Sequence, residues 1–171
     1  DVGSGKTIVA IISALHVICS GYQVAILVPT ELLANQHYDF IQERFKLLNI
    51  NVCLLTSSTE YKSALHKKIE NGNYNLVIGT HTLIQNNIRF KNLSYVIIDE
   101  QHRFGVEQRL KIRKKGSKVD MLLLSATPIP RTMLLVTLGD ISISTIKEKP
   151  FTNKVTTILK SDKNLSEVIK Y

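Results

Sequence analysis

The first seven residues, DVGSGKT, contain the residue types of a phosphate-binding loop. Gly3, Ser4 and Gly5 are small, so successive backbone N–H groups can converge on one anion at the positive end of a following helix. Lys6 would then reach the β- and γ-phosphates of a nucleotide, while the Thr7 hydroxyl would hold Mg²⁺. A glycine-rich turn before a helix is the alternative. The apolar stretch that follows at once favours the phosphate-binding loop, whose full pattern GxxxxGK[ST] would begin one residue earlier.

A second group of reactive side chains, Asp-Glu-Gln-His, follows the apolar run YVII. A carboxylate at the carboxyl end of a strand points into the ligand crevice of an open α/β sheet. Asp99 would organise Mg²⁺, usually through water, and Glu100 would orient and deprotonate the water that attacks a nucleotide. An ordinary acidic turn is the alternative. The GKT sequence four strand–helix segments earlier favours the catalytic interpretation.

Hydroxyl groups follow three other apolar runs. Ser125 and Thr127, in SATPIPRT, could bond to the acidic motif and report the loss of the γ-phosphate. The segments Pro-Thr-Glu at 29–31 and Gly-Thr-His at 79–81 offer small and hydroxyl residues that can bind sugar-phosphate. A proline-rich turn would account for the first of these patterns. Simple helix capping accounts for the other two equally well.

The elements that must position these residues form an alternating pattern. Five apolar runs lack the apolar/polar alternation of a one-sided sheet, which predicts parallel strands covered by helices on both faces. We expect strands at residues 22–28, 51–56, 75–79, 95–99 and 121–125, and helices at 6–20, 31–48, 60–71, 105–115 and 131–138. Gly21 and Gly72 are expected to end helices, and Thr30 and Thr59 to cap the starts of two others.

The composition changes after Ile146, so residues 1–146 are expected to form one unit. Residues 147–154, KEKPFTNK, are polar and contain a proline, which indicates a linker. Residues 155–171 begin a new strand and helix, as if a second domain were starting. We expect the chain to lack the strand that should lead into the phosphate-binding loop. We expect its loss to leave a gap at the centre of the sheet and to expose strand edges.

Composition excludes several classes of protein. Hydrophobic residues make up 44% of the 171 residues, with only 8 glycines and 4 prolines, which excludes disordered, collagenous and proline-rich chains. Two cysteines exclude a disulfide scaffold, and no Cys/His spacing indicates zinc. The longest nearly apolar run, residues 8–19, is shorter than the roughly 20 residues of a membrane span. No secretory signal is visible, so we expect a cytoplasmic protein.

The formal net charge of +8 makes a polyanion such as nucleic acid a more plausible partner than an acidic protein. A soluble basic domain without such a partner explains the charge equally well. Six of the 22 basic residues lie close together, at Arg109, Lys111, Arg113, Lys114, Lys115 and Lys118. They could track phosphates, but a solvated helix face is the favoured interpretation.

Taken together, the segments GSGKT, VPTELLANQH, IGTHTLIQ, IIDEQHRFGVEQR and SATPIPRT resemble the first motor domain of a superfamily 2 helicase. DEQHRFGVEQRL and SATPIPRT resemble most closely the RecG family of ATP-dependent DNA helicases. They are less similar to the transcription-repair coupling factors, in which the acidic motif usually reads DEEH. The resemblance runs from residue 1 to roughly residue 160 and is far more specific than the phosphate-binding loop alone.

The resemblance implies a RecA-like P-loop NTPase fold with the following assignments. ATP is expected at Gly3, Ser4, Gly5, Lys6 and Thr7, and Mg²⁺ at Thr7 and Asp99. Catalysis is expected from Lys6, Asp99, Glu100 and His102, with His102 coupling hydrolysis to movement. Coupling is also expected from Ser125 and Thr127, and contact with the DNA backbone from Pro29, Thr30, Gly79, Thr80 and His81. The family remodels stalled forks and branched junctions by pumping duplex DNA, and we expect its full-length members to act as monomers.

RecG-like proteins are several times longer than this chain. We expect this chain to lack their wedge domain, which recognises the branch, and their second motor domain, which supplies an arginine finger. Residues 150–154, PFTNK, stand where the family tends to have a Pro-Gly-Arg-Lys-like stretch. We therefore expect the chain alone to bind nucleotide weakly and to hydrolyse it poorly, because an arginine finger contributes ~10³–10⁵ in rate.

The leading hypothesis is thus a truncated first motor domain of a RecG-type helicase, with a complementing polypeptide as one possible source of the rest. Two alternatives stay open. The chain could be a non-catalytic fragment that binds nucleic acid through its basic face. It could also be a split-gene product without function, in which case it should not melt cooperatively.

Overall fold

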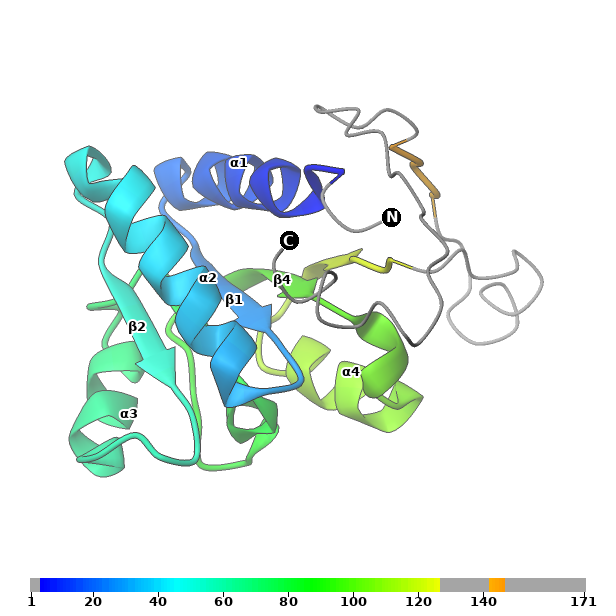
Figure 1. Ribbon diagram of the computed structural model, residues 1–171. Coiled ribbons are helices and arrows are strands. Elements are labelled where there is room, and N and C mark those ends of the chain that lie inside the picture. Colours follow the sequence, from blue (N-terminus) through cyan, green and yellow to red (C-terminus); the bar gives the residue numbers. More distant parts are fainter. Residues whose placement is uncertain (1–3, 127–141, 147–171) are drawn as a thin grey trace, which may run out of the picture.

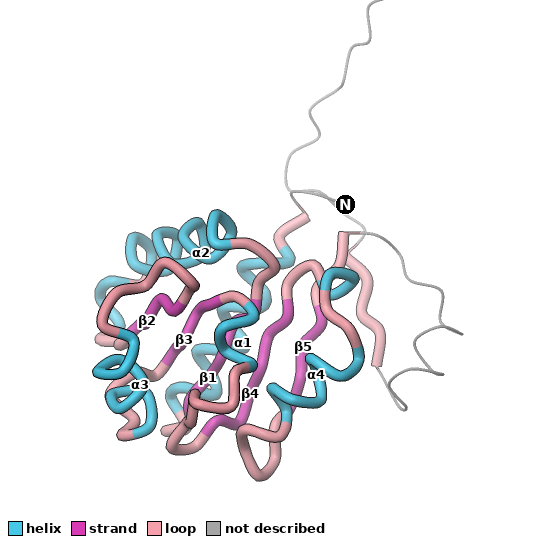
Figure 2. Tube along the Cα trace, turned by 90° about the horizontal axis from the view of Figure 1, so that it is seen from below, coloured by secondary structure: helices cyan, strands magenta, loops and turns pink. Residues whose placement is uncertain are grey.

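The computed structural model describes residues 4–126 and 142–146, in which a parallel sheet is covered by helices on both faces (Figure 1). The strands are β1 (Gln23–Leu27), β2 (Val52–Leu55), β3 (Leu76–Gly79), β4 (Leu93–Ile98) and β5 (Asp120–Leu123). Figure 2 shows their order in the sheet, β2-β3-β1-β4-β5. All four neighbouring pairs are parallel. The predicted α/β class and the five predicted strands are confirmed, with β4 starting at Leu93 rather than at residue 95.

The sheet separates two hydrophobic clusters, and each cluster is covered by two of the helices. The helices are α1 (Lys6–Cys19), α2 (Glu31–Arg44), α3 (Lys62–Glu70) and α4 (Val106–Arg113), with short 3₁₀ turns η1 (Lys46–Leu48), η2 (His81–Ile84) and η3 (Gln101–Arg103). Ala10 of α1 and Ala34 of α2 pack in one hydrophobic cluster, and Ile69 of α3 and Ile112 of α4 pack in the other. Successive residues of each strand belong alternately to one cluster and the other. Both faces of the strands are therefore apolar, which explains the continuous apolar runs.

Most predicted helix ends are confirmed. Gly21 and Gly72 follow α1 and α3 with φ of +86° and +80°, a conformation that glycine adopts at little cost. The Thr30 hydroxyl accepts a hydrogen bond from the N–H of Leu33 and so caps α2. The helix predicted at residues 31–48 ends at Arg44 and is followed by the separate turn η1.

The predicted cap at Thr59 is wrong. Its hydroxyl accepts a hydrogen bond from the N–H of Thr56 at 2.8 Å, within the turn that precedes α3. The residue immediately before α3 is Tyr61, with φ of +50°, and the helix begins at Lys62. The helix predicted at residues 131–138 lies outside the described residues.

The gap expected at the centre of the sheet is also wrong. The described strands are contiguous, and β5 is an edge strand whose apolar residues are only half-buried, whereas β1 is buried throughout. Helices α1 and α2 lie on the same face of the sheet.

Gln23 joins three segments at the amino end of β1. Its side-chain amide donates hydrogen bonds to the carbonyls of Ile69 and Tyr74, and its oxygen accepts from the N–H groups of Lys91 and Asn92. Gln23 is only 3% exposed, and the bond to Ile69 is fully buried while the other three are partly buried. A buried amide with satisfied partners fixes the positions of the segments it connects.

Packing alone requires glycine at position 79. A Cβ there would collide with the carbonyl oxygen of Leu55 and press on the side chain of Leu83. We expect Gly79→Ser to lower the free energy of unfolding by about 1–3 kcal/mol, as overpacking does. Gly105 is the matched control, because a Cβ there meets nothing within 4 Å and serine is a favoured helix cap. Urea unfolding of both variants checks the prediction, and equal losses would contradict it.

The two cysteines differ in accessibility and therefore in reactivity. Burial raises the pKa of the Cys53 thiol to about 12, whereas Cys19 is exposed. Since the thiolate is the reactive form, we expect one thiol per chain to react quickly with a disulfide reagent at pH 8 and the second only in urea. Two fast thiols without urea would mean that the chain alone does not hold this fold.

Candidate active site

Pairing in register brings the carboxyl ends of the strands into one row. The aligned residues across the sheet are Leu55, Gly79, Leu27, Ile98 and Leu123. Backbone hydrogen bonds extend this alignment, because the N–H of Asp99 donates to Leu27 and that of Leu124 donates to Ile98. The acidic motif, Ser125 and the segments at 29–31 and 79–81 lie at or directly after these strand ends. They therefore meet along one edge of the sheet, as expected for an open α/β fold.

The predicted phosphate-binding loop leads directly into α1. Gly5 has φ of +86°, a left-handed conformation that lets the chain turn into the helix at Lys6. The Lys6 ammonium donates to the hydroxyl of Ser4 at 3.2 Å, and Ser4 is buried. Thr7 is half-buried in the first turn, whereas Gly3 lies outside the described residues. The described part of the loop thus places the ammonium group at the amino end of α1.

Asp99 is held by two hydrogen bonds. One carboxylate oxygen lies 3.0 Å from Nε2 of His37, and the other accepts the N–H of Glu100 at 2.9 Å. Burial raises the pKa of Asp99, but these bonds and the charges of His37 and Lys6 outweigh it and keep the pKa below its usual value. The contribution of Lys6 is the smallest of these and indicates that the loop lies on the side of the acidic motif. The carboxylate is therefore ionised and ready to interact with a cation.

Glu100 adopts an unusual backbone conformation. Its φ is +50°, in the left-handed region that non-glycine residues rarely occupy, and such strain is concentrated at functional sites. Its carboxylate lies 3.4 Å from Nδ1 of His102, which makes these two predicted catalytic side chains neighbours.

The segment after β5 lies beside the acidic motif. The N–H of Gln101 donates a hydrogen bond to the carbonyl of Leu124. Ser125, the next residue, therefore lies beside the acidic motif. Thr127, its predicted partner in coupling, lies outside the described residues.

Asp99 and Thr7 are residue types that suit Mg²⁺ bound with a nucleotide. The described residues contain no group of three or more His, Cys, Asp or Glu side chains that could hold a metal ion alone. Magnesium in nucleotide sites takes one or two protein carboxylates or hydroxyls, with phosphates and water filling the other positions. Asp99 and Thr7 carry oxygen ligands of this kind and would hold the ion together with a bound nucleotide.

The predicted DNA-backbone residues differ in accessibility. Thr30 and His81 are exposed and Pro29 is half-buried, whereas Gly79 and Thr80 are buried. The hydroxyl of Thr80 bonds to that of Thr82 at 3.2 Å inside the protein. Of these five residues, Thr30 and His81 are therefore the most accessible to a ligand.

Two polar contacts at this edge were missed by the sequence analysis. The Glu31 carboxylate accepts hydrogen bonds from the hydroxyls of Ser57 and Ser58, which lower its pKa and join α2 to the β2–α3 loop. The second is the contact of His37 with Asp99. Its signal was the spacing of Ala34, His37 and Ile41, which puts a histidine on the apolar face of α2.

The basic stretch is only partly a solvated helix face, so the favoured interpretation was incomplete. Arg109 is buried, and burial lowers its pKa. Lys115 donates to the carbonyls of Gln85 and Ile88 at 2.7 Å each, and Lys111 pairs with Glu107. A cavity of about 520 Å³ lies here, with four basic lining residues, Arg89, Lys111, Lys114 and Lys115.

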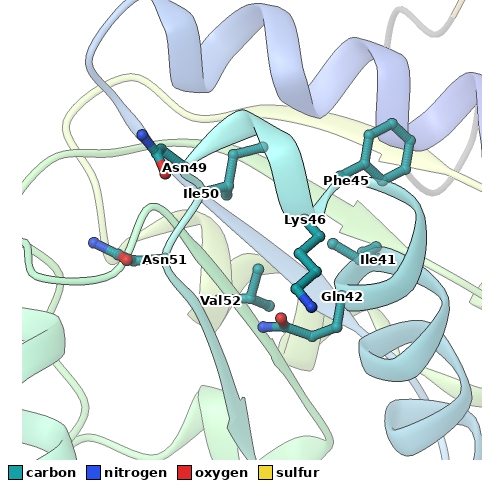
Figure 3. Close-up of a pocket in the computed structure, with 8 residues that line it drawn as sticks. All are labelled: Ile41, Gln42, Phe45, Lys46, Asn49, Ile50, Asn51 and Val52. Carbon is teal, nitrogen blue, oxygen red and sulfur yellow. The ribbon is translucent and has the colours of Figure 1, made fainter.

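A second cavity, of about 400 Å³, lies at the carboxyl end of α2 (Figure 3). Its lining residues are Ile41, Gln42, Phe45, Lys46, Asn49, Ile50, Asn51 and Val52. None of the predicted site residues lines either cavity, and this one contains no carboxylate or histidine. In the part of the chain that the structure describes, no helix has the length and apolar character needed to cross a membrane.

The chain is similar to RecG over a limited region of that protein. It is 54% identical to ATP-dependent DNA helicase RecG of Aquifex aeolicus over 154 residues, covering 88% of this chain and 19% of that protein. It is 47% identical to RecG of Thermotoga maritima, covering 100% of this chain and 22% of that protein. The chain thus spans about a fifth of the length of these curated relatives.

Solved structures support the same fold. The structure of RecG bound to a three-way DNA junction matches with a TM-score of 0.79 and 45% identity, covering 99% of this chain and 23% of that one. The DEAD-box helicase Mss116 bound to single-stranded RNA matches with a TM-score of 0.63, 24% identity and 78% of this chain, and supports the fold alone. The parallel sheet with helices on both faces is therefore the RecA-like helicase fold. The model of the DEAD/DEAH box helicase family matches residues 1–136, most of the 171 residues, and the chain belongs to this family.

Proposed function

We propose that this chain is the first motor domain of a RecG-type DNA helicase and that it binds ATP with Mg²⁺ at the carboxyl edge of its sheet. The observation that carries the proposal is the position of Asp99 directly after β4, where its carboxylate is held by His37 and by the N–H of Glu100. The charge of Lys6, in the phosphate-binding loop, also helps to lower the pKa of Asp99, which supports a position of the loop near the acidic motif. Residues 1–146 would form this motor domain, and residues 147–171 a linker and the start of a second one.

Each residue has a role that follows from its chemistry. The backbone of Gly3, Ser4 and Gly5 would surround the phosphates, with the Lys6 ammonium on the β- and γ-phosphates. Bound Mg²⁺ would neutralise phosphate charge, held by Thr7 and Asp99.

Hydrolysis and its coupling to movement would depend on the neighbouring side chains. Glu100 would orient the attacking water and accept its proton. His102 contacts the Glu100 carboxylate, which supports its role in coupling the state of the site to movement. Ser125, with Thr127, would report loss of the γ-phosphate.

The nucleic-acid partner is proposed from position and from the relatives. Thr30 and His81 are exposed on the edge that carries the nucleotide site. With Pro29, Gly79 and Thr80 they would contact the backbone of branched or forked DNA, which the RecG structure with a three-way junction supports. In the complete protein, ATP hydrolysis would drive translocation on duplex DNA. Other segments of such a protein, or a complementing polypeptide, would supply the arginine finger.

Nucleotide binding and turnover should separate in this chain. We expect a fluorescent ATP analogue to bind, Lys6→Ala to weaken this binding at least tenfold, and Glu100→Gln to leave it within about threefold, because of these two side chains only Lys6 would contact phosphate directly. We expect ATP turnover far below that of a complete helicase, since an arginine finger contributes ~10³–10⁵ in rate. Nucleotide titrations and a phosphate-release assay measure both. Turnover equal to that of a complete helicase, or unchanged binding in Lys6→Ala, would contradict the proposal.

A second candidate function is binding of nucleic acid without catalysis. The cavity of about 520 Å³ with four basic lining residues favours it. Salt-dependent DNA binding that survives both Lys6→Ala and Glu100→Gln, in a chain that binds no nucleotide, would support this candidate over the first.

A further inference from the structure

His37 is the one polar side chain among the three buried residues of α2. The helix packs on the sheet through Ala34, His37 and Ile41, and His37 is only 8% exposed. A buried imidazole loses contact with water and needs a specific partner. That partner is the carboxylate of Asp99, 3.0 Å from Nε2.

The direction of this hydrogen bond follows from Asp99. An ionised carboxylate can only accept, so Nε2 of His37 carries the proton and donates it. The second carboxylate oxygen is already fixed by the N–H of Glu100. The two bonds together determine how the carboxylate faces the nucleotide site.

The same helix is fixed at its amino end. Thr30 caps it, and the Glu31 carboxylate binds the hydroxyls of Ser57 and Ser58 and the N–H of Ser58. His37 follows Thr30 by about two turns, or ~10 Å along a rigid helix. Any shift of the amino end of α2 therefore moves the imidazole that holds Asp99.

We propose that His37 is a positioning residue, which orients Asp99 for the nucleotide-bound cation and transmits nucleic-acid contact at the amino end of α2 to that cation. This rests on the proposed function, since it requires both ligands. The two ligands then affect each other's affinity reciprocally, because each changes the position of the same helix. In this role, the hydrogen bond from Nε2 is essential and the volume of the side chain is not.

Three substitutions separate the hydrogen bond from packing. In His37→Gln, the amide nitrogen stands where Nε2 stood and can donate to Asp99. In His37→Asn, the amide reaches only the position of Nδ1, and in His37→Leu there is no donor. In the His37→Gln variant, we expect Mn²⁺ to bind to the chain–ADP complex with an affinity within about threefold of wild type. In His37→Asn and His37→Leu, we expect the affinity for Mn²⁺ to fall about tenfold or more, which is the usual effect of removing a partner of a metal ligand.

Electron paramagnetic resonance measures free Mn²⁺ in these titrations, and urea unfolding checks that each variant folds. If His37→Leu does not fold, the Gln and Asn pair alone decides. Addition of a short DNA duplex should change the Mn²⁺ affinity of wild type and His37→Gln but not that of His37→Asn. Equal Mn²⁺ affinities in all variants, or a Gln variant as weak as Asn, would overturn the inference while leaving the proposed function intact.

A readout without ligand tests the same bond even if no nucleotide binds. In the nuclear magnetic resonance spectrum of the chain alone, the proton on Nε2 of His37 should exchange slowly and resonate downfield. Asp99→Asn should shift this resonance, and His37→Gln should remove it. Absence of the resonance in the folded wild-type chain would refute the positioning role. Its presence together with a failure to bind nucleotide would refute the proposed function instead.

Discussion

The parallel pairing of β1 with β3 and β4 is the constraint on which the candidate site depends. Because Leu27 is in register with Gly79 on one side and Ile98 on the other, the segments after these strands leave the sheet at the same level. Side chains contributed by the distant regions around Thr30, His81 and Asp99 therefore share one edge. A change in register by one residue would reverse the faces of a strand and separate these groups.

At this edge, opposing effects set the charge state of Asp99. Burial alone would make its carboxyl group harder to ionise, and the partners outweigh that effect. Lys6 belongs to the phosphate-binding loop, and His37 belongs to the helix whose amino end carries Thr30. One carboxylate thus feels the charge of the candidate nucleotide loop and bonds to the helix whose amino end carries Thr30. A motor domain requires this kind of connection, because binding at one site must change the other.

The sequence was informative where one physical effect dominates. Continuous apolar runs predicted the strands because both faces of the sheet are buried, and Gly21 predicted a helix end because left-handed backbone favours glycine. The motifs around Lys6 and Asp99 predict a nucleotide site because their chemistry follows from residue type, and this assignment stays a prediction.

Contacts between distant segments were not predictable in this way. Nothing local marks Gln23 as the residue that joins three segments, and Thr59 has the right type for a cap but bonds within its own turn. The order of the strands, and with it the position of β5 at an edge, depends on crossovers rather than on composition.

The central claim is that nucleotide and metal bind between Lys6 and Asp99. Paramagnetic broadening of amide resonances by Mn²⁺–ADP tests it most directly, because the broadening falls steeply with distance from the metal. The account predicts loss of the signals of Gly5, Thr7 and Asp99, with those of Asn49 and Ile50 at the opposite end of α2 unchanged. Broadening confined to Asn49 and Ile50, or no broadening at saturating Mn²⁺–ADP, would contradict it.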